Sequence, residues 1–179
     1  GPADAYTHLG YGSISTNPCG EIPQSAYDSC RLLLVNLVKF VVDPFTDKAR
    51  FDFDRFDQVV QKGQRLMDDL VDLELEAIDR IVAKIHRDPE PDDVKRPELD
   101  LWSKVRAAAV GGRRTGLGIT ALGDTLAYLG IKYGSDESVE ATERLYKALA
   151  LGAYRSTVTM AGERGPFPKF DLETERDHE

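Results

Sequence analysis

The segment Asn17-Pro18-Cys19-Gly20-Glu21 places an amide, a thiol and a carboxylate at alternate positions. In an extended segment, side chains at i, i+2 and i+4 lie on one side, so Asn17, Cys19 and Glu21 could converge on one small ligand. Pro18 and Gly20 disfavour a helix and favour a tight, exposed loop. Cysteine can supply a nucleophile or a sulfur radical, a carboxylate can act as a base, and an amide can orient hydroxyl groups.

The thiol of Cys19 also has a simpler interpretation, because free cysteine is often a small buried filler. Spacing alone does not separate that interpretation from a functional one. A hydrolytic cysteine needs a histidine base, and His8 is the nearest in sequence; His86 and His178 are expected to be exposed polar residues. Structural zinc is held by cysteine or histidine ligands that lie in close pairs, and Cys19 and Cys30 are not such a pair. No metal site is therefore predicted.

Two further charged stretches have plain structural interpretations. Gly111–Gly118, with Arg113 and Arg114, matches neither the Walker pattern nor the dinucleotide fingerprint. It is interpreted as a turn between helices that carries a solvated basic pair. The carboxylates along Asp54–Glu76 are interpreted as the wet face of an amphipathic helix.

Composition favours one soluble domain, or a piece of a larger one, because 41% of the 179 residues are hydrophobic and 30% are charged. A net charge of -8 argues against a general nucleic-acid binder. The longest apolar run, Leu32–Val42, is interrupted by Asn36 and Lys39, so no membrane span is predicted. Two cysteines indicate a reducing, cytoplasmic setting. Gly1-Pro2 is typical of a protease-cleavage scar, which places the natural N-terminus elsewhere.

The first half of the sequence predicts loop, strand and helix in that order. Residues 3–31 are rich in Gly, Ser, Thr and Pro and predict loop with short strands at most. Arg31–Val42 is compatible with a buried strand that runs into a helix. A long helix is predicted from Asp54, as its N-cap, to about His86. Its apolar face is formed by Phe56, Val59, Val60, Met67, Leu70, Val71, Ile78, Ile81, Val82 and Ile85.

Three more helices are predicted downstream. One begins at Pro97 and ends at Gly111-Gly112. One covers 115–129, before Gly130. The last is capped by Ser135, ends at Gly165, and has an apolar face of Val139, Tyr146, Leu149, Ala153, Tyr154 and Met160. The predicted fold class is therefore mainly α, with few short strands.

Two stretches are Asn17-Pro18-Cys19-Gly20-Glu21-Ile22-Pro23 and Asp28-Ser29-Cys30. Together they resemble the active-site region of ribonucleotide reductase large subunits. The continuation Ser29-Cys30-Arg31-Leu32-Leu33-Leu34-Val35-Asn36-Leu37 is similar to the adenosylcobalamin-dependent class. Later segments match in order: Arg114-Thr115-Gly116-Leu117-Gly118-Ile119, Leu129-Gly130-Ile131-Lys132-Tyr133 and Glu163-Arg164-Gly165-Pro166-Phe167-Pro168. The resemblance implies an oxidoreductase that makes 2′-deoxyribonucleotides for DNA synthesis.

The resemblance also implies site residues. By position, Cys19 would hold a transient thiyl radical and abstract the 3′-hydrogen, and Glu21 would take the 3′-hydroxyl proton. Asn17 would hydrogen-bond the ribose hydroxyls, and Ser29 and Gly20 would contact substrate. Cys30 would be one of two thiols that deliver electrons and become a disulfide.

The family's catalytic subunit is far longer and contains a ten-stranded α/β barrel. The resemblance therefore implies that residues 1–179 are one fragment of that barrel domain, with the finger loop and strand at 3–42 and a helical portion at 54–168. It implies adenosylcobalamin, a ribonucleotide, a thioredoxin-like reductant and the remaining segments of the reductase as partners. The chain alone is expected to be inactive and to self-associate through uncovered apolar surface. The alternative is a non-catalytic helical interaction module.

Overall fold

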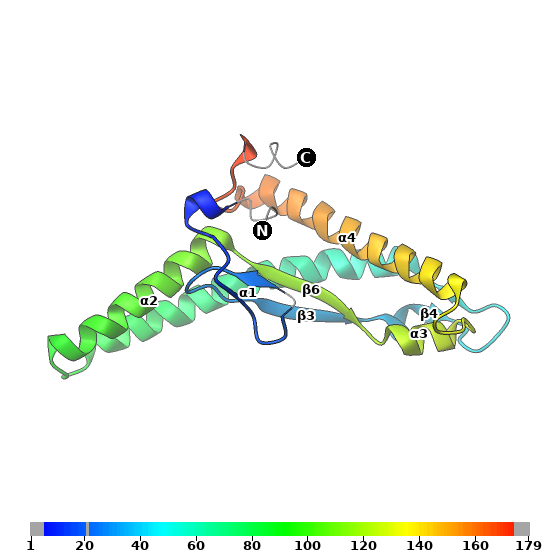
Figure 1. Ribbon diagram of the computed structural model, residues 1–179, viewed down its shortest axis with the longest axis horizontal. Helices are drawn as coiled ribbons and strands as arrows, with labels where there is room; N and C mark the ends of the chain where they lie inside the picture. The colour runs from blue at the N-terminus through cyan, green and yellow to red at the C-terminus, as the bar shows by residue number, and fades with distance from the viewer. Residues whose placement is uncertain (1–5, 21, 174–179) are drawn as a thin grey trace. The chain divides into compact units, whose positions relative to one another are not determined.

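The computed structural model describes residues 6–20 and 22–173, and these are mostly helical with few short strands (Figure 1). Gly1-Pro2, Glu21 and His178 lie outside the described residues. The elements are, in chain order, η1 (Thr7–Leu9), β1 (Ser15–Thr16), β2 (Pro23–Gln24), β3 (Arg31–Asn36), η2 (Leu37–Phe40), β4 (Val41–Val42), β5 (Arg50–Phe51), α1 (Phe53–Arg87), α2 (Asp92–Gly112), β6 (Thr115–Thr120), α3 (Leu122–Tyr128) and α4 (Asp136–Arg164).

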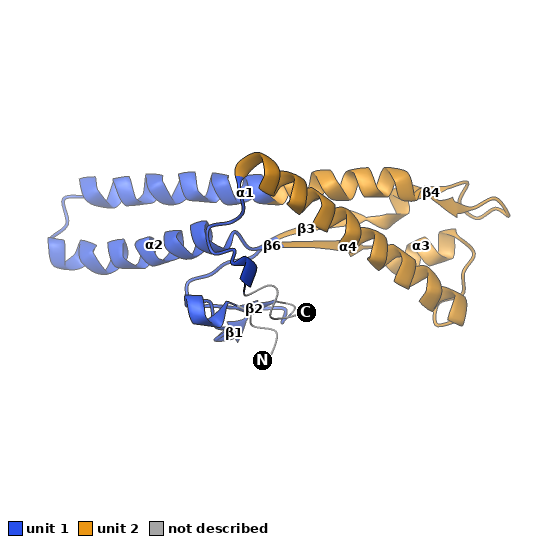
Figure 2. Cartoon of the chain, turned by 90° about the horizontal axis from the view of Figure 1, so that it is seen from above, with its two compact units in different colours: residues 1–31, 68–115, 165–179 blue, residues 32–67, 116–164 orange. Residues whose placement is uncertain are grey.

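The chain divides into two compact units, coloured separately in Figure 2. Unit 1 contains residues 1–31, 68–115 and 165–179, and unit 2 contains residues 32–67 and 116–164. The strands pair two by two, as β1 with β2, β3 with β6, and β4 with β5. The first and last of these pairs are antiparallel. The prediction of a mainly α fold with few short strands is confirmed for the described residues.

Unit 2 is built around an apolar core. Strand β3 alternates, so that Val35 is buried while Leu32 and Leu34 are exposed. The ring of Phe56, on α1, lies 5.2 Å from that of Phe40 at an interplanar angle of 75°. The buried members of the cluster are Val35, Leu37, Phe40, Phe56, Val60, Leu145 and Leu149. Strand β3, η2, α1 and α4 thus bury one shared apolar surface, which is the main stabilising term for such a unit.

Most of the predicted apolar face of α1 is confirmed, and its N-cap lies two residues before the predicted one. Asp52, rather than Asp54, is the cap: its Oδ1 accepts from the backbone N–H of Arg55 at 3.0 Å. Leu70, predicted on the apolar face, is exposed. The buried positions are Phe56, Val60, Gly63, Met67, Val71, Ile78 and Ile85, which keep helical spacing.

Residues 115–120 were predicted as the start of a helix, and this is wrong: they form strand β6, paired with β3. Glycine alternates with larger residues here, and Gly116 and Gly118 are poor helix formers. A Cβ on Gly118 would lie 2.9 Å from Leu34 Cδ2, so the strand approaches β3 closely at this point. Helix α3 then begins at Leu122, after Ala121 adopts a left-handed φ of 64°.

Helix α2 begins at Asp92, five residues before the predicted start at Pro97. Pro91 is extended and acts as the N-cap, and the carboxylates of Asp92 and Asp93 favour the positive end of the helix. Pro97 is tolerated inside the helix near this end. The predicted stop at Gly112 is confirmed, and Arg113 follows in a left-handed conformation, with φ of 42°.

Helix α4 begins where it was predicted, because Ser135 Oγ accepts from the backbone N–H of Ser138. Its predicted apolar face is partly wrong. Leu149 and Met160 are buried, whereas Val139, Tyr146 and Tyr154 are exposed. The buried row is Ser138, Leu145, Leu149, Gly152, Ser156 and Met160. Small residues let α4 approach α1 closely, and an apolar pattern alone does not reveal such a contact.

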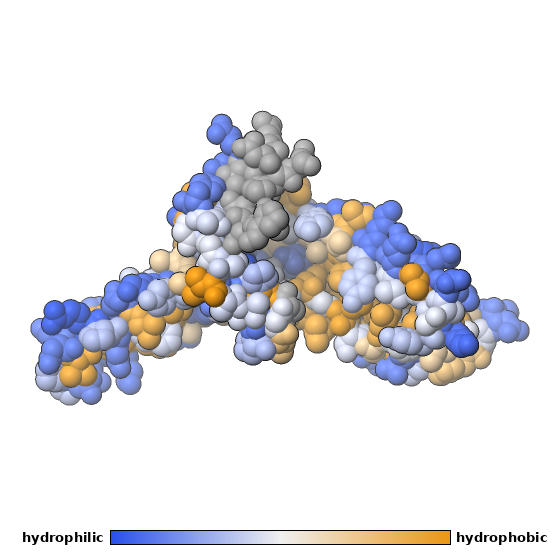
Figure 3. Space-filling view, in the orientation of Figure 1, coloured by the Kyte–Doolittle hydropathy of each residue, from blue (hydrophilic) through white to orange (hydrophobic). Residues whose placement is uncertain are grey.

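Apolar side chains also lie at the surface, where orange atoms are visible among blue ones in the space-filling view (Figure 3). Exposed members include Leu66, Leu70 and Leu73 on α1 and Val139, Leu151 and Val158 on α4. Among the residues that the structure describes, no helix combines the length and apolarity needed to cross a bilayer.

Candidate functional site

The cysteine segment at 17–22 is a closed turn in unit 1. The backbone N–H of Asn17 donates to the Ile22 carbonyl, and Ile22 N–H donates back to Asn17 Oδ1, each at 3.0 Å. Gly20 N–H donates to the Asn17 carbonyl at 3.0 Å. Gly20 has a left-handed φ of 81°, which glycine adopts without strain. The predicted tight loop is confirmed, and a single asparagine closes it.

This turn places Cys19 and Asn17 in different environments. Cys19 is exposed, so its interpretation as a buried core filler is wrong. Asn17 is only 7% exposed, and its Oδ1 is already bound to the backbone. Since the chain turns here, the same-side alternation of an extended segment does not apply, and Nδ2 is the part of the Asn17 amide suited to address a ligand. Glu21 lies outside the described residues.

The second cysteine, Cys30, is half-buried and held between two anchored neighbours. Ser29 Oγ donates to Glu74 Oε1 at 3.1 Å. Arg31 Nε donates to Glu74 Oε2 at 2.5 Å, and its Nη2 also forms an ion pair with that carboxylate. Arg31 Nη1 donates to the Ser29 carbonyl at 3.1 Å. Ser29, predicted to contact substrate, thus has its hydroxyl directed at α1.

A second carboxylate, that of Asp28, hydrogen-bonds to the same segment. Its side chain is 1% exposed, and its Oδ1 accepts from the backbone N–H of Ser29 at 2.8 Å. Its Oδ2 accepts from Arg114 Nε at 2.7 Å. Arg114 Nη1 donates to the carbonyl of Pro23, the residue that follows the Cys19 turn. Arg114 therefore connects the end of that turn with the segment that carries Cys30.

We name Asp28, Arg31, Glu74 and Arg114 the arginine–carboxylate cluster. Sequence reasoning missed its role, because it assigned Arg114 to a solvated turn and Glu74 to a wet helix face. Both assignments are wrong. The available signal was local: charges of opposite sign flank Ser29-Cys30, and Arg114 belongs to a motif quoted for the family resemblance. No sequence pattern pairs Glu74 with Arg31, 43 positions away.

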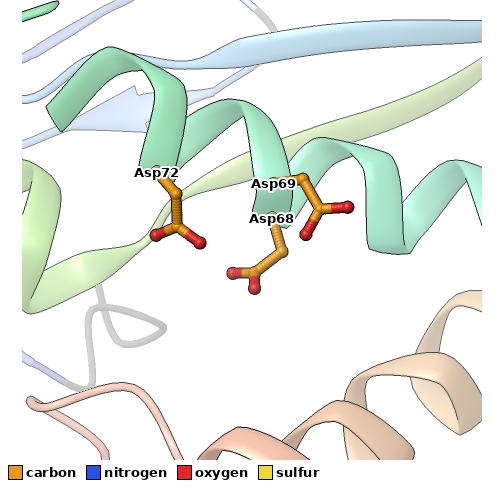
Figure 4. A group of neighbouring side chains, drawn as sticks. All are labelled: Asp68, Asp69 and Asp72. Atoms are coloured by element: carbon orange, nitrogen blue, oxygen red, sulfur yellow. The ribbon is translucent and has the colours of Figure 1, made fainter. Parts of the chain in front are cut away.

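Three carboxylates lie together on α1, from Asp68, Asp69 and Asp72, with oxygens within 4.8 Å of one another (Figure 4). Arg113 already engages this group, through Nε to Asp68 at 2.7 Å and Nη1 to Asp72 at 2.8 Å. Burial acts to lower the pKa of Arg113, but the hydrogen bonds to these two carboxylates outweigh it and raise the pKa. The group is thus a partner for an internal cation. The assignment of Arg113 to a solvated turn is also wrong.

Two other features bear on the predicted chemistry. His8, the candidate base of a hydrolase, has its Nε2 4.0 Å from a carboxylate oxygen of Asp171, and both side chains are largely exposed.

Unit 2 has an open groove lined by Phe53, Asp54, Asp57, Gln58, Arg144, Lys147, Ala148, Leu151 and Arg155. Its cations are partly engaged: Arg155 pairs with Asp57 at 2.8 Å, and Arg144 lies over Phe53.

The groove does not suit a corrin. It is shallow and carries charges of both signs, whereas a large cofactor needs an enclosing and mostly apolar site. This groove therefore does not by itself fit adenosylcobalamin, and no residue of this chain is assigned to it.

Comparison with protein-family models matches residues 7–178 to "Ribonucleotide reductase, barrel domain". The chain is 35% identical over 162 residues to a vitamin B12-dependent ribonucleoside-diphosphate reductase of Mycobacterium tuberculosis, covering 90% of this chain and 19% of that protein. It is 32% identical over 154 residues to the protein of the same name from Thermoplasma acidophilum, covering 86% of this chain and 16% of that protein.

A more distant similarity extends to viral proteins. The ribonucleoside-diphosphate reductase large subunit of an African swine fever virus isolate is 24% identical over 155 residues, which covers 87% of this chain and 16% of that protein. The chain thus spans less than a fifth of the length of the curated relatives that it matches.

Proposed function

Because the chain belongs to the ribonucleotide reductase family, within its barrel domain, we propose that it carries the radical-bearing loop of a vitamin B12-dependent reductase. The substrate class is a ribonucleotide, and the product is the 2′-deoxyribonucleotide. The observation that carries the proposal is Cys19, exposed on a turn that Asn17 closes from both ends. A reactive sulfur must meet one C–H bond in a fixed geometry, and a hydrogen-bonded turn provides that rigidity.

The first step is a hydrogen-atom transfer. The Cys19 sulfur, as a thiyl radical, takes the 3′-hydrogen: the C3′–H bond breaks, an S–H bond forms, and the unpaired electron moves to C3′. Glu21 accepts the proton of the 3′-hydroxyl, as the family resemblance implies. The Nδ2 group of Asn17 donates to a ribose hydroxyl, since Oδ1 is occupied by Ile22.

The reduction that follows consumes two electrons from two thiols. The 2′-hydroxyl leaves as water, a C2′–H bond forms, and the two thiols become a disulfide. Cys30 is one of them, as the family resemblance implies; because residues 1–179 hold two cysteines and Cys19 is the radical carrier, the second thiol would lie outside residues 1–179. A thioredoxin-like dithiol returns the disulfide to thiols. Before that reduction, Cys19 gives its hydrogen back to C3′ and becomes a thiyl radical again, and the proton held by Glu21 returns to the 3′-oxygen.

Adenosylcobalamin would supply radical chemistry when bound in the whole reductase, and no residue of this chain is assigned to hold it. The side chains of this chain contribute in a different way, because they hold Cys19 and Cys30 in position.

The remaining inferences concern the larger assembly. We propose that residues 1–179 are one part of a ten-stranded barrel in a cytoplasmic reductase, and that the chain alone is inactive. We further propose that it self-associates through its exposed apolar side chains. Sedimentation at increasing concentration should show growing mass, and a concentration-independent monomer would contradict this.

The function is tested by placing residues 7–178 into the matching position of the Thermoplasma acidophilum relative. The chimera should reduce a ribonucleoside diphosphate in the presence of adenosylcobalamin, and 3′-deuteration of the substrate should slow turnover. Cys19→Ser should abolish turnover, whereas Ser13→Ala, a matched loop variant, should retain it. Turnover that survives Cys19→Ser, or the absence of a 3′ isotope effect, would refute the proposal and favour the non-catalytic helical module.

A further inference from the structure

Cys30 lies inside a ring of polar contacts that closes on one carboxylate. Its neighbour Ser29 donates to one oxygen of Glu74, and its other neighbour, Arg31, donates to the second. Arg31 also donates to the Ser29 carbonyl, which closes the ring around the backbone of Cys30. The thiol itself lies 3.7 Å from the Arg31 carbonyl. The backbone on both sides of the sulfur is thus held by Glu74, from α1.

The two ion pairs of the arginine–carboxylate cluster are joined to each other. Asp28 accepts from the Ser29 N–H, and Arg31 Nη1 donates to the carbonyl of Arg114 at 3.2 Å. Two cations and two carboxylates balance in charge. The side chains of Asp28 and Arg31 are 1% and 8% exposed, so these charges are shielded from solvent. Shielded, charge-assisted hydrogen bonds hold geometry more strongly than exposed ones.

The cost of this arrangement indicates a role beyond stability. Taking charges out of water is expensive, and apolar side chains of similar volume often stabilise a fold as well or better. The exposed pair Arg80–Glu76, by comparison, lies within one helix and joins no loop segments. The pairs Arg31–Glu74 and Arg114–Asp28, each with one buried partner, surround Ser29-Cys30 and reach the carbonyl of Pro23 beside the Cys19 turn.

We propose that the arginine–carboxylate cluster positions the Cys30 thiol, with Glu74 as its principal positioning residue and Arg114 as the second anchor. The inference rests on the proposed function, because a thiol that must deliver electrons to a buried reaction needs a defined place. Glu74 acts through Ser29 and Arg31 and touches no reacting atom.

The test follows the reactivity of Cys30 in this chain, in a Cys19→Ser background where it is the single thiol. The rate constant with an aromatic disulfide reagent is measured at several low denaturant concentrations. Glu74→Ala should raise the rate in the absence of denaturant roughly tenfold, since it releases two charge-assisted contacts. Arg114→Ala should also raise the rate constant of Cys30. Glu74→Gln keeps an acceptor for Ser29 and should give a smaller rise, which preserves the test if the alanine variant fails to fold.

The matched control is Glu76→Ala, two positions along the same helix, whose carboxylate lies 3.8 Å from the exposed Arg80. Its rate should stay within about twofold of the parent, as expected for an exposed pair. A positioning role predicts faster reaction that is independent of denaturant, because the change is local. If the Glu74 variants match the control, or gain reactivity only in proportion to global unfolding, the proposal is overturned.

This readout requires no turnover, so it is separate from the test of Cys19 in the chimera. An intact effect of Glu74 on Cys30 together with turnover that survives Cys19→Ser would refute the proposed function alone. Loss of turnover in Cys19→Ser together with an unresponsive Cys30 would refute the positioning role alone.

Discussion

Different forces stabilise the interior of each unit. Unit 2 contains the apolar cluster of Phe40, Phe56, Val60, Leu145 and its neighbours, with aromatic rings packed edge to face. Unit 1 also buries apolar residues of α1 and α2, but around its two cysteines the chain is held by charged and amide groups. Apolar burial is non-directional, whereas a charge-assisted hydrogen bond fixes an angle and a distance. The segments that carry thiols are thus fixed by directional contacts.

The largest expected effect lies in unit 2. Phe56→Ala removes a fully buried ring that packs on Phe40 and Phe51, and it should lower the free energy of unfolding by about 4 kcal/mol. The loss should be insensitive to salt, because no charge is involved. Denaturant titration measures it. The control, Leu66→Ala on the same helix, changes an exposed residue, and a loss as large as that of Phe56→Ala would refute a core centred on Phe56.

The next effect tests unit 1. Arg114→Ala leaves the buried carboxylate of Asp28 without its cation and should cost about 2 kcal/mol, less than a fully buried pair because Arg114 is 30% exposed. Denaturant titration at low and high salt should show a smaller cost at high salt. Arg106→Ala breaks the exposed pair with Asp79 and is the control, which should be near neutral. Equal effects of the two arginine variants would remove the contrast between the units.

The close approach of α4 to α1 gives a third comparison within unit 2. A Cβ on Gly152 would lie 2.9 Å from both Asp57 Oδ1 and Val60 Cγ1, so Gly152→Ala should destabilise by about 1 kcal/mol. Gly162, on the same helix, has open space around it, and Gly162→Ala should stabilise by about 0.5 kcal/mol. Thermal unfolding should give shifts of opposite sign, and shifts of the same sign would contradict close packing at Gly152.

The fold was predictable where local rules agree. The α1 face, the Ser135 cap and the stop at Gly112 follow from periodicity and capping chemistry, which depend on neighbours a few positions apart. Strand β6 was mistaken for a helix because its pairing with β3, far away in sequence, outweighs the local apolar spacing. The buried face of α4 was misplaced for a similar reason: Gly152 and Ser156 face the core because small residues permit close approach.

The site was predictable to a different extent. Pro18 and Gly20 predicted the tight turn at Cys19, because these residue types disfavour a helix, and the hydrogen bonds of the turn confirm it. The use of Asn17 Oδ1 to close the turn depends on where the Ile22 amide comes to lie, and no spacing rule gives that. The roles of Cys19, Glu21 and Cys30 in a reaction remain predictions.

The smallest expected effect tests how Tyr11 is held in unit 1. Burial raises the pKa of Tyr11 above its usual 10.0, the charge of Asp28 adds to the rise, and Arg114 opposes it. Because the folded-state pKa is raised, the stability from the neutral phenol is fully present below pH 10.0 and is lost as pH rises through the folded-state value. Thermal unfolding between pH 8 and pH 11 should therefore show a steeper alkaline decline in the parent than in Tyr11→Phe. Tyr133→Phe, at an exposed tyrosine, is the control and should follow the parent. If the profiles of the parent and Tyr11→Phe coincide, the phenol is solvated. The polar contacts of unit 1 then do not include those of the Tyr11 hydroxyl with the Ala107 and Ala108 carbonyls.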